Sequence, residues 1–319
     1  MDFDKTLNYI LAFMSGVILY ILSHKIFNIE GITSTPTSTC PCSCTPTSRK
    51  YPCPTPIRSG ITFSNESLKP AVQAYLDDIN DTKTKQTYGD ISNWDVSMVT
   101  DMSNLFEDQQ HFNEDISRWD VSKVTTMKDM FKGTSTFNQD IGCWDVSSVT
   151  TMESMFEGCL KFNQDISGWD VSSVTTMENM FNGVNSFNQN IGSWDVSNVA
   201  TMEGMFYGAS SFNQNLISWD VSSVLSMREM FRKATSFNQN IGCWDVSNVT
   251  TMDSMFLGAT SFNGKISRWD VSSVTDMDSM FEETTSFNQD ISSWDVNEVG
   301  TFYNFNEGIP PSYKPQFKF

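Results

Sequence analysis

Hydrophobic residues recur along most of the chain with a period of 25 residues, and each period begins with Trp. We number the positions of each unit from its Trp, which is position 0. The tryptophans are Trp94, Trp119, Trp144, Trp169, Trp194, Trp219, Trp244, Trp269 and Trp294. A short period without insertions predicts a solenoid, in which each unit buries its apolar side chains against its neighbours.

The same positions are apolar in every full unit. Val occupies positions 2 and 5, Met position 8, Met or Leu position 11, Phe positions 12 and 18, and Ile or Leu position 22. We expect these residues to point inward and to form ladders with the tryptophans. No single unit could bury so many large side chains alone, so stability must come from stacking.

Two elements are predicted in each unit. The alternation in Trp-Asp-Val-Ser is typical of a short strand, which would pair in parallel with the next unit at about 4.8 Å. The segment "TTMESMF" predicts a helical turn, because Thr150 and Glu153 have capping-box spacing. The expected fold is therefore a solenoid with one strand and one helical turn per coil.

Asp at position 1 and Asn at position 19 are the same in every full unit. We expect the Asn side chains to bond loop backbone groups of adjacent coils. We expect the Asp side chains to accept hydrogen bonds from N–H groups of the turn that follows. A Ca²⁺-binding edge of stacked Asp, from Asp95 to Asp295, is the alternative. It is disfavoured because position 21 varies and includes Lys265.

The N-terminal residues predict a membrane anchor. Residues 6–27 are mostly apolar and about long enough to cross a bilayer. A cleaved signal peptide is the alternative, but the amino end is not basic and no small-residue cleavage site follows. We therefore expect an uncleaved anchor over 1–30, and a single-pass membrane protein whose repeats lie on the extracellular or virion-surface side.

Four further regions follow the anchor. Residues 31–60 are rich in Thr, Pro and Cys and predict an extended stalk. Residues 61–93 predict an N-terminal cap and partial repeat, with a helix over 64–78. Eight full repeats occupy 94–293, and 294–319 form a degenerate ninth repeat and C-terminal cap.

The seven cysteines fall into two groups. Cys40, Cys42, Cys44 and Cys53 are crowded in the predicted stalk, where disulfides are favoured over a metal site because the spacing and the absence of a nearby His fit zinc poorly. Cys143, Cys159 and Cys243 are scattered through the repeats, and we expect them to be small fillers.

The net charge of −18 argues against nucleic acid as a partner, since phosphates require Lys and Arg. Most of this charge lies in the repeats, where the basic residues are few and clustered. Two islands stand out as candidate partner-binding residues, namely Lys123, Lys128, Lys132, and Arg228, Arg232, Lys233. A merely solvated surface is the plainer alternative.

No catalytic, cofactor or metal motif is present in the sequence. The only histidines are His24 and His111, and no glycine-rich phosphate loop or HExxH segment occurs. A polysaccharide-acting β-helix enzyme would place unusual carboxylates on adjacent coils. Because the repeat departs from its pattern mainly at the ends, where caps explain the change, we expect no catalysis and no cofactor.

The repeat "WDVSSVTTMESMFEGCLKFNQDIS" resembles the 25-residue repeat of BspA-like surface proteins, which are related to leucine-rich repeats. The resemblance spans about residues 86–299. It implies a surface-displayed right-handed solenoid associated with adhesion or partner binding.

The sequence thus predicts a membrane-anchored, non-catalytic protein that mediates adhesion or recognises a protein or glycan. A structural spacer or coat component is the alternative function. The sequence does not identify the partner, the source lineage, the membrane orientation, the disulfide connectivity or the oligomeric state.

Overall fold

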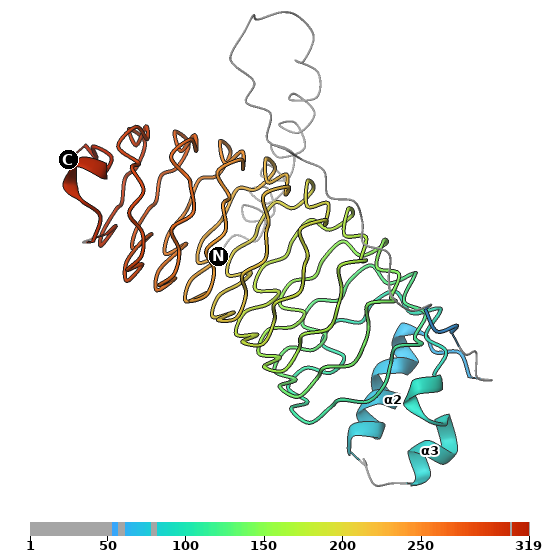
Figure 1. Cartoon of the computed structure of the whole chain (residues 1–319). Helices are drawn as coiled ribbons and strands as arrows, with labels where there is room; N and C mark the ends of the chain where they lie inside the picture. The colour runs from blue at the N-terminus through green and yellow to red at the C-terminus, as the bar shows by residue number, and fades with distance from the viewer. Residues whose placement is uncertain (1–52, 57–60, 78–81, 307, 319) are drawn as a thin grey trace, which may run out of the picture. The chain divides into compact units, whose positions relative to one another are not determined.

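The computed structural model describes residues 53–56, 61–77, 82–306 and 308–318. Between an N-terminal helical region and a short C-terminal segment, turn-rich coils follow one another along a stack (Figure 1). The named elements are α2 (Asn65–Asp77), α3 (Thr82–Tyr88) and the 3-10 helices η1 (Ile91–Asn93) and η2 (Pro311–Tyr313). We number the coils from coil 1, which begins at Trp94, to coil 8, which begins at Trp269.

Hydrogen bonds between neighbouring coils follow one regular scheme. The backbone N–H groups at positions 8, 10, 12 and 14 donate to carbonyls at positions 7, 9, 11 and 13 of the next coil. In coil 2, for example, the N–H of Met127 donates to Thr151 O at 3.1 Å, and that of Phe131 to Met155 O at 3.0 Å. Each coil is therefore bonded to the next through every second residue of this segment.

The predicted strand at Trp-Asp-Val-Ser is wrong. In the described residues, parallel pairing occurs only as isolated bridges, such as Thr151↔Thr176 at position 7, and no sheet forms. The Ser147 N–H donates to Asp145 Oδ1 at 3.1 Å, and the Val149 N–H to Val146 O at 2.9 Å. These N–H groups are used within the coil, so they cannot join a ladder between coils.

The predicted helical turn is also wrong. Positions 10 and 14 have left-handed backbone, with φ of 52° at Ser154 and 72° at Gly158, which a right-handed helix does not tolerate. Alternate N–H groups point to the next coil and not back along a helix. The Thr150 hydroxyl donates to Thr125 O at 3.1 Å, and so is not a helix cap. The fold is thus a stack of turns, and the strand-plus-helix leucine-rich-repeat solenoid is not formed.

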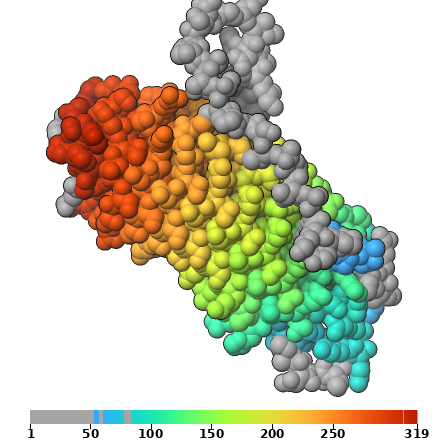
Figure 2. Space-filling view, in the orientation of Figure 1, coloured from blue at the N-terminus to red at the C-terminus, as the bar shows by residue number. Residues whose placement is uncertain are grey.

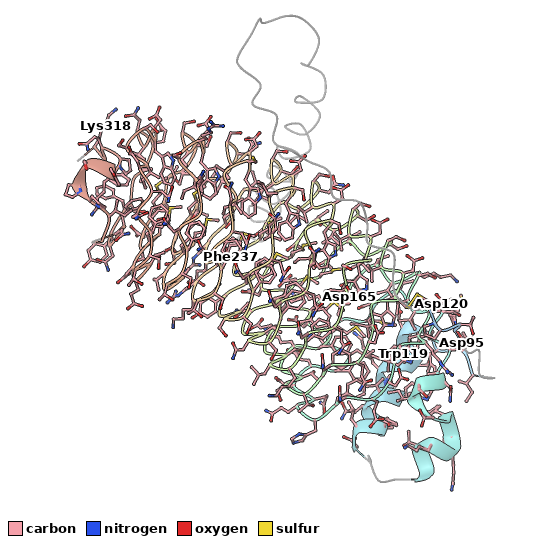
Figure 3. All side chains as sticks on the ribbon, viewed as in Figure 1. Asp95, Trp119, Asp120, Asp165, Phe237 and Lys318 are labelled. Carbon is pink, nitrogen blue, oxygen red and sulfur yellow. A yellow bond between two sulfur atoms is a disulfide. The ribbon has the colours of Figure 1, made fainter. Side chains whose placement is uncertain are left out.

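The apolar positions form the core of the stack. Trp, Val, Met and Phe side chains of successive coils are buried and lie against their equivalents; Trp119 and Phe237 mark two of them in Figure 3. The rings of Phe131 and Phe156 are stacked with centroids 5.7 Å apart. Each buried tryptophan of a full coil also satisfies its indole N–H, as when Trp144 Nε1 donates to Ile116 O at 3.2 Å. Burying one such side chain stabilises the stack by roughly 1.5–3 kcal/mol.

The Asn residues at position 19 form the ladder that the sequence predicts. The N–H of Asn163 donates to Asn138 Oδ1 at 2.9 Å, and Gln164 Nε2 donates to Asn138 O at 2.9 Å. The same Asn-to-Asn bond recurs in each later coil. The amide therefore satisfies backbone groups between coils, as expected.

Both ends of the stack are covered. At the first end, Phe63 stacks on Trp94 with centroids 4.8 Å apart, and Asn65 Oδ1 accepts the N–H groups of Thr100 and Asp101. Residue Asn65 begins α2, which is the helix predicted over 64–78. At the other end, the Phe317 ring stacks on Phe302 at 4.2 Å. Figure 2 shows the coils between them as adjoining bands of colour.

The prediction of a single-pass membrane protein is corrected. In the part of the chain that the structure describes, no helix is both long and apolar enough to cross a membrane. Residues 6–27, where the anchor was predicted, lie outside the described residues, as does most of the predicted stalk at 31–60. The membrane anchor and the surface location inferred from it are therefore not retained.

Candidate partner-binding face

Variable charged side chains occupy positions 9, 10 and 13 of the coils, and we call these residues the charged face. They lie beside the core residues at positions 8, 11 and 12. The residues at positions 9 and 13 are half-buried or exposed, whereas some at position 10, such as Asp129 and Ser154, are buried. Position 9 carries, in chain order, Ser103, Lys128, Glu153, Glu178, Glu203, Arg228, Asp253 and Asp278. The core residues of the same segment hardly change, so between positions 8 and 13 the variation falls on the charged face.

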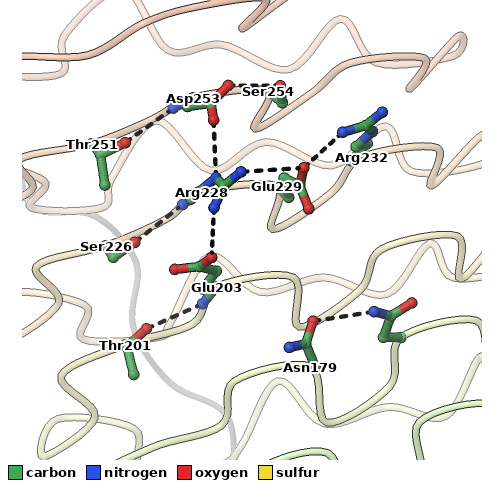
Figure 4. Close-up of polar contacts among 11 residues, drawn as sticks. Asn179, Thr201, Glu203, Ser226, Arg228, Glu229, Arg232, Thr251, Asp253 and Ser254 are labelled. Atoms are coloured by element: carbon green, nitrogen blue, oxygen red, sulfur yellow. Dashed lines mark hydrogen bonds and ion pairs between the residues drawn. The ribbon is translucent and has the colours of Figure 1, made fainter.

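Arg228 links three coils of the charged face (Figure 4). Its Nε is 2.9 Å from Asp253 Oδ2 in coil 7, and its Nη1 is 3.3 Å from Glu203 Oε1 in coil 5. Within its own coil, Nη2 lies 4.0 Å from Glu229 Oε1. The hydrogen bond to Asp253 and the surrounding carboxylates raise the pKa of Arg228. The guanidinium thus offsets the repulsion of acids stacked at one position.

Arg232 lies at position 13 of the same coil and contacts two groups. Its Nη1 donates to Glu229 Oε1 at 2.6 Å, and its guanidinium lies over the Tyr207 ring, 5.3 Å from the centroid. Such a cation–π contact contributes about 0.5–1 kcal/mol at an exposed site. Its Nε is buried and has no hydrogen-bond partner among the described residues. Glu229 is therefore shared by the two arginines of coil 6.

Coil 2 repeats this arrangement with lysines. Lys128 Nζ is 2.7 Å from Glu153 Oε1, and Lys132 Nζ is 3.1 Å from Glu157 Oε2 and 3.6 Å from Asp129 Oδ1. The hydrogen bond with Glu153 raises the pKa of Lys128. Coils 2 and 6 therefore share a cation–acid–cation pattern four coils apart.

The remaining two basic residues predicted to bind a partner lie outside these contacts. Lys123 is at position 4, with Nζ 3.2 Å from Met98 Sδ. Lys233 is exposed at position 14, where φ is +57°. The structure thus groups Lys128 with Lys132 and Arg228 with Arg232, and pairs each with carboxylates. The islands are mixed-charge clusters and not basic patches.

Glu178 lies between the two clusters, with a Glu at the same position in each adjacent coil. Partial burial raises the pKa of its carboxyl, and the charges of Glu203 and Glu153 raise it further. Coils 3 to 5 therefore carry three successive glutamates at position 9.

The Asp side chains at position 1 accept hydrogen bonds within the following turn, as predicted. Asp120 Oδ1 accepts the Ser122 hydroxyl at 2.6 Å and the Ser122 N–H at 3.2 Å. The equivalent hydrogen bonds from Ser172 lower the pKa of Asp170; the bond from its hydroxyl has the larger effect and the bond from its N–H the smaller. Among the described residues, no group of three or more His, Cys, Asp or Glu is placed to hold a metal ion.

Cys159 is a small buried filler, as expected, but Cys143 and Cys243 are not. Cys143, at position 24 of coil 2, forms a disulfide with Cys53, with a Cα–Cα distance of 5.5 Å. Cys243, at the same position of coil 6, is also disulfide-bonded. Cys159 alone is a buried thiol; it donates to Phe131 O, and burial raises its pKa. Because Cys143 and Cys243 are four repeats apart, the sequence excludes a bond between them, but it carries no signal for the pairing of Cys143 with Cys53.

Comparison with known proteins places the repeats in a family. Residues 76–190, 162–252 and 239–308 match the family described as "Mycoplasma protein of unknown function, DUF285". Together the matches cover well over half of the chain. The chain belongs to this family. No curated protein and no solved structure matches it.

The three matches overlap, as expected when a family is defined by tandem repeats. In this DUF285 protein, they extend from α2 to the residues just before η2. The whole charged face therefore lies within the matched region. The family description states no function, so the function must be argued from the site itself.

Proposed function

We propose that this protein is a non-catalytic recognition protein that binds a protein partner through the charged face. The observation that supports the proposal is the change of charge at positions 9, 10 and 13 from coil to coil, directly beside core positions 8, 11 and 12, which hardly change. A surface that varies on a constant scaffold is suited to recognition, because its charges can be changed without altering the core.

The charged face is also preorganised. Arg228 and Lys128 are held by carboxylates of neighbouring coils, and each coil is fixed to the next by backbone hydrogen bonds. A partner that matches this charge pattern would bind without ordering loops, which is a major cost of association. Mixed charges on a rigid surface favour specificity and rapid association.

The resemblance of the repeat to that of BspA-like surface proteins supports the same function, since such arrays are associated with adhesion or partner binding. We include assignment to the BspA-like group in the proposal. The rival function is a spacer or coat component, for which the length of the stack matters and its surface does not.

The test uses the full oxidised chain against arrays of purified proteins and of glycans. Glu178→Lys reverses charge within the three successive glutamates at position 9, and Glu298→Lys makes the same change at an exposed residue of the partial ninth coil. We expect Glu178→Lys to weaken capture of a protein partner by roughly tenfold and Glu298→Lys to leave it unchanged.

Three outcomes would oppose the proposal in different ways. Equal capture by the wild type and Glu178→Lys would remove the charged face as the binding surface. Saturable capture of glycans alone would change the partner class. Absence of any capture would favour the spacer, for which variants shortened by one full coil would be the next measurement.

A further inference from the structure

A disulfide ties the residues before α2 to the second coil of the stack. Cys53 and Cys143 are bonded with their Cα atoms 5.5 Å apart, although 90 residues separate them in the sequence. Cys143 is the last residue of coil 2 and directly precedes Trp144, the first residue of coil 3. The bond therefore encloses α2, α3, coil 1 and coil 2 in one covalent loop.

The noncovalent contacts of the same N-terminal segment hold it to coil 1. Thr62 Oγ1 donates to Asp95 Oδ2 at 3.0 Å, and the Phe63 N–H donates to Asp95 O at 2.8 Å. These contacts secure the helical region on coil 1. They do not strengthen the attachment of coil 1 to coil 2, which depends on hydrogen bonds between the coils and on the disulfide.

The ends of such a stack are its weakest parts. Each coil contacts only its neighbours, so a coil at an end is held from one side. Local opening at an end costs less free energy than unfolding of the whole chain. A long covalent loop limits the conformations that the opened segment can gain. The disulfide between Cys53 and Cys143 therefore opposes opening of the first two coils.

The C-terminal end lacks a bond of this kind. The last cysteine of the sequence is Cys243, so coils 7 and 8 and the residues after them contain none. This end is covered by contacts such as the hydrogen bond from the Ile291 N–H to Tyr313 O, at 3.0 Å, and the stacked rings of Phe302 and Phe317. In the oxidised chain, the C-terminal coils should therefore open more readily than the first two.

The disulfide is accessible to a reductant. Cys53 is exposed, and Cys143 is half-buried. A thiolate from solution attacks the sulfur that it can reach, which is that of Cys53, and Cys143 leaves as the thiolate. When the reductant is a dithiol, its second thiol completes the exchange. The dithiol loses two electrons and two protons and becomes a disulfide, and Cys53 and Cys143 become two thiols.

Loss of the bond leaves the core of coil 2 unchanged. The same position, 24, carries serine in three other coils, as Ser193, Ser218 and Ser293. A small polar side chain therefore fits this backbone without a disulfide. The reduced Cys143 should likewise be compatible with a folded coil.

We propose that the bond between Cys53 and Cys143 is a redox-sensitive latch of the N-terminal end. In the oxidised state it keeps the helical region and coils 1 and 2 closed. In the reduced state these parts open locally, while the later coils stay stacked. The proposal does not depend on the function proposed for the charged face, because its readout is opening of the backbone.

The experiment is hydrogen exchange of the full chain, followed by mass spectrometry, for the wild type and for Cys53→Ser/Cys143→Ser. Peptides of coil 1 report on the N–H groups of Asn104 and Phe106, which donate to carbonyls of coil 2 at 2.9 Å. A peptide of coil 6 reports on the Phe231 N–H, which donates to Met255 O at 2.9 Å. We expect coil 1 to exchange about tenfold faster or more in the double variant, and coil 6 to be unchanged.

Two controls separate the latch from other effects. Slow exchange of the coil 6 peptide shows that the double variant is folded. Cys243→Ser makes the same substitution at position 24 of coil 6, where the cysteine is also disulfide-bonded, and should leave exchange of coil 1 as in the wild type. Added dithiol should give the wild type the coil 1 exchange of the double variant, and reoxidation should restore the slow exchange.

Three results would overturn the proposal. Unchanged exchange of coil 1 in the double variant would show that the bond does not limit opening of this end. Equal acceleration in coils 1 and 6, or acceleration of coil 1 by Cys243→Ser to the same extent, would show a general loss of stability. Wild-type coil 1 that exchanges slowly even with the dithiol would show a permanent bond and not a switch.

Discussion

Two sets of polar residues on the same coils behave in opposite ways. The capping residues, which are the Asp at position 1 and the Asn at position 19, are the same in every full coil, whereas the charged face changes in almost every coil. A capping oxygen must reach a particular N–H, as Asn138 Oδ1 reaches the N–H of Asn163. An ion pair requires only some opposite charge nearby. Bonds to the backbone therefore constrain residue identity, and bonds between side chains do not.

The largest effect is expected where a capping residue serves two donors. Asn188 Oδ1 accepts the Asn213 N–H at 3.0 Å and Gln214 Nε2 at 2.8 Å. Asn188→Ala should lower the free energy of unfolding by about 1–3 kcal/mol, because both donors lose their partner. Urea denaturation measures this change. Asn182→Ala, on the charged face, removes one bond to Asn179 and should change stability by at most about 0.5 kcal/mol. Equal costs for the two variants would contradict the comparison.

Loss of an Asp side chain at position 1 should have the second largest effect on stability. Asp170→Ala removes the acceptor for the Ser172 hydroxyl and N–H, at a cost of about 1 kcal/mol. Asp170→Asn keeps Oδ1 and should cost less. These hydrogen bonds hold the pKa of Asp170 below 3.8, so the charged carboxylate stabilises the fold above that pH. The advantage of the wild type over Asp170→Asn should therefore shrink as the pH falls through the folded-state pKa. A gap that widens in acid would show the reverse linkage.

The ion pairs of the charged face should contribute less. Arg228→Gln should lower stability by roughly 0.2–1 kcal/mol at low salt, since the pairs are partly exposed. The difference should decrease in 1 M salt, which screens exposed charges. Lys233→Gln, at the exposed neighbour of Arg232, is the matched control and should have little effect. A cost for Arg228→Gln that is unchanged by salt would argue for packing of the side chain and not for its charge.

The smallest change should be a gain in stability and not a loss. Partial burial and the charges of Glu203 and Glu153 raise the pKa of Glu178, so its ionised form opposes folding. Glu178→Gln should therefore stabilise the protein slightly at pH 7, and the gain should disappear as the pH falls through the raised pKa, where the wild-type carboxyl becomes neutral. Thermal melts from pH 7 to pH 4 test this. Destabilisation at pH 7 would mean that the carboxylate has a favourable partner.

The backbone conformation is the part of the fold that sequence reasoning predicted incorrectly. Alternating apolar residues in Trp-Asp-Val suggest a strand, but Asp145 draws the N–H of Ser147 into a turn. Glu229 and Lys233 have left-handed backbone that their residue types do not indicate, because hydrogen bonds to neighbouring coils impose it. Only a glycine such as Gly158 indicates a left-handed turn in the sequence.

The candidate sites depended even more on packing. The basic residues of the two islands can be identified in the sequence. Their pairing with acidic residues of other coils follows from the 25-residue register of the stack.

The sequence by itself determined the period, the core positions and the roles of the invariant Asp and Asn, because each depends on one coil and its identical neighbour. Only the tertiary structure decided the turn conformation, the pairing of Cys53 with Cys143 and the neutralisation of the basic islands. These features depend on which groups of different coils approach one another. Residue patterns within a coil do not encode those distances, whereas the stacked backbone determines them.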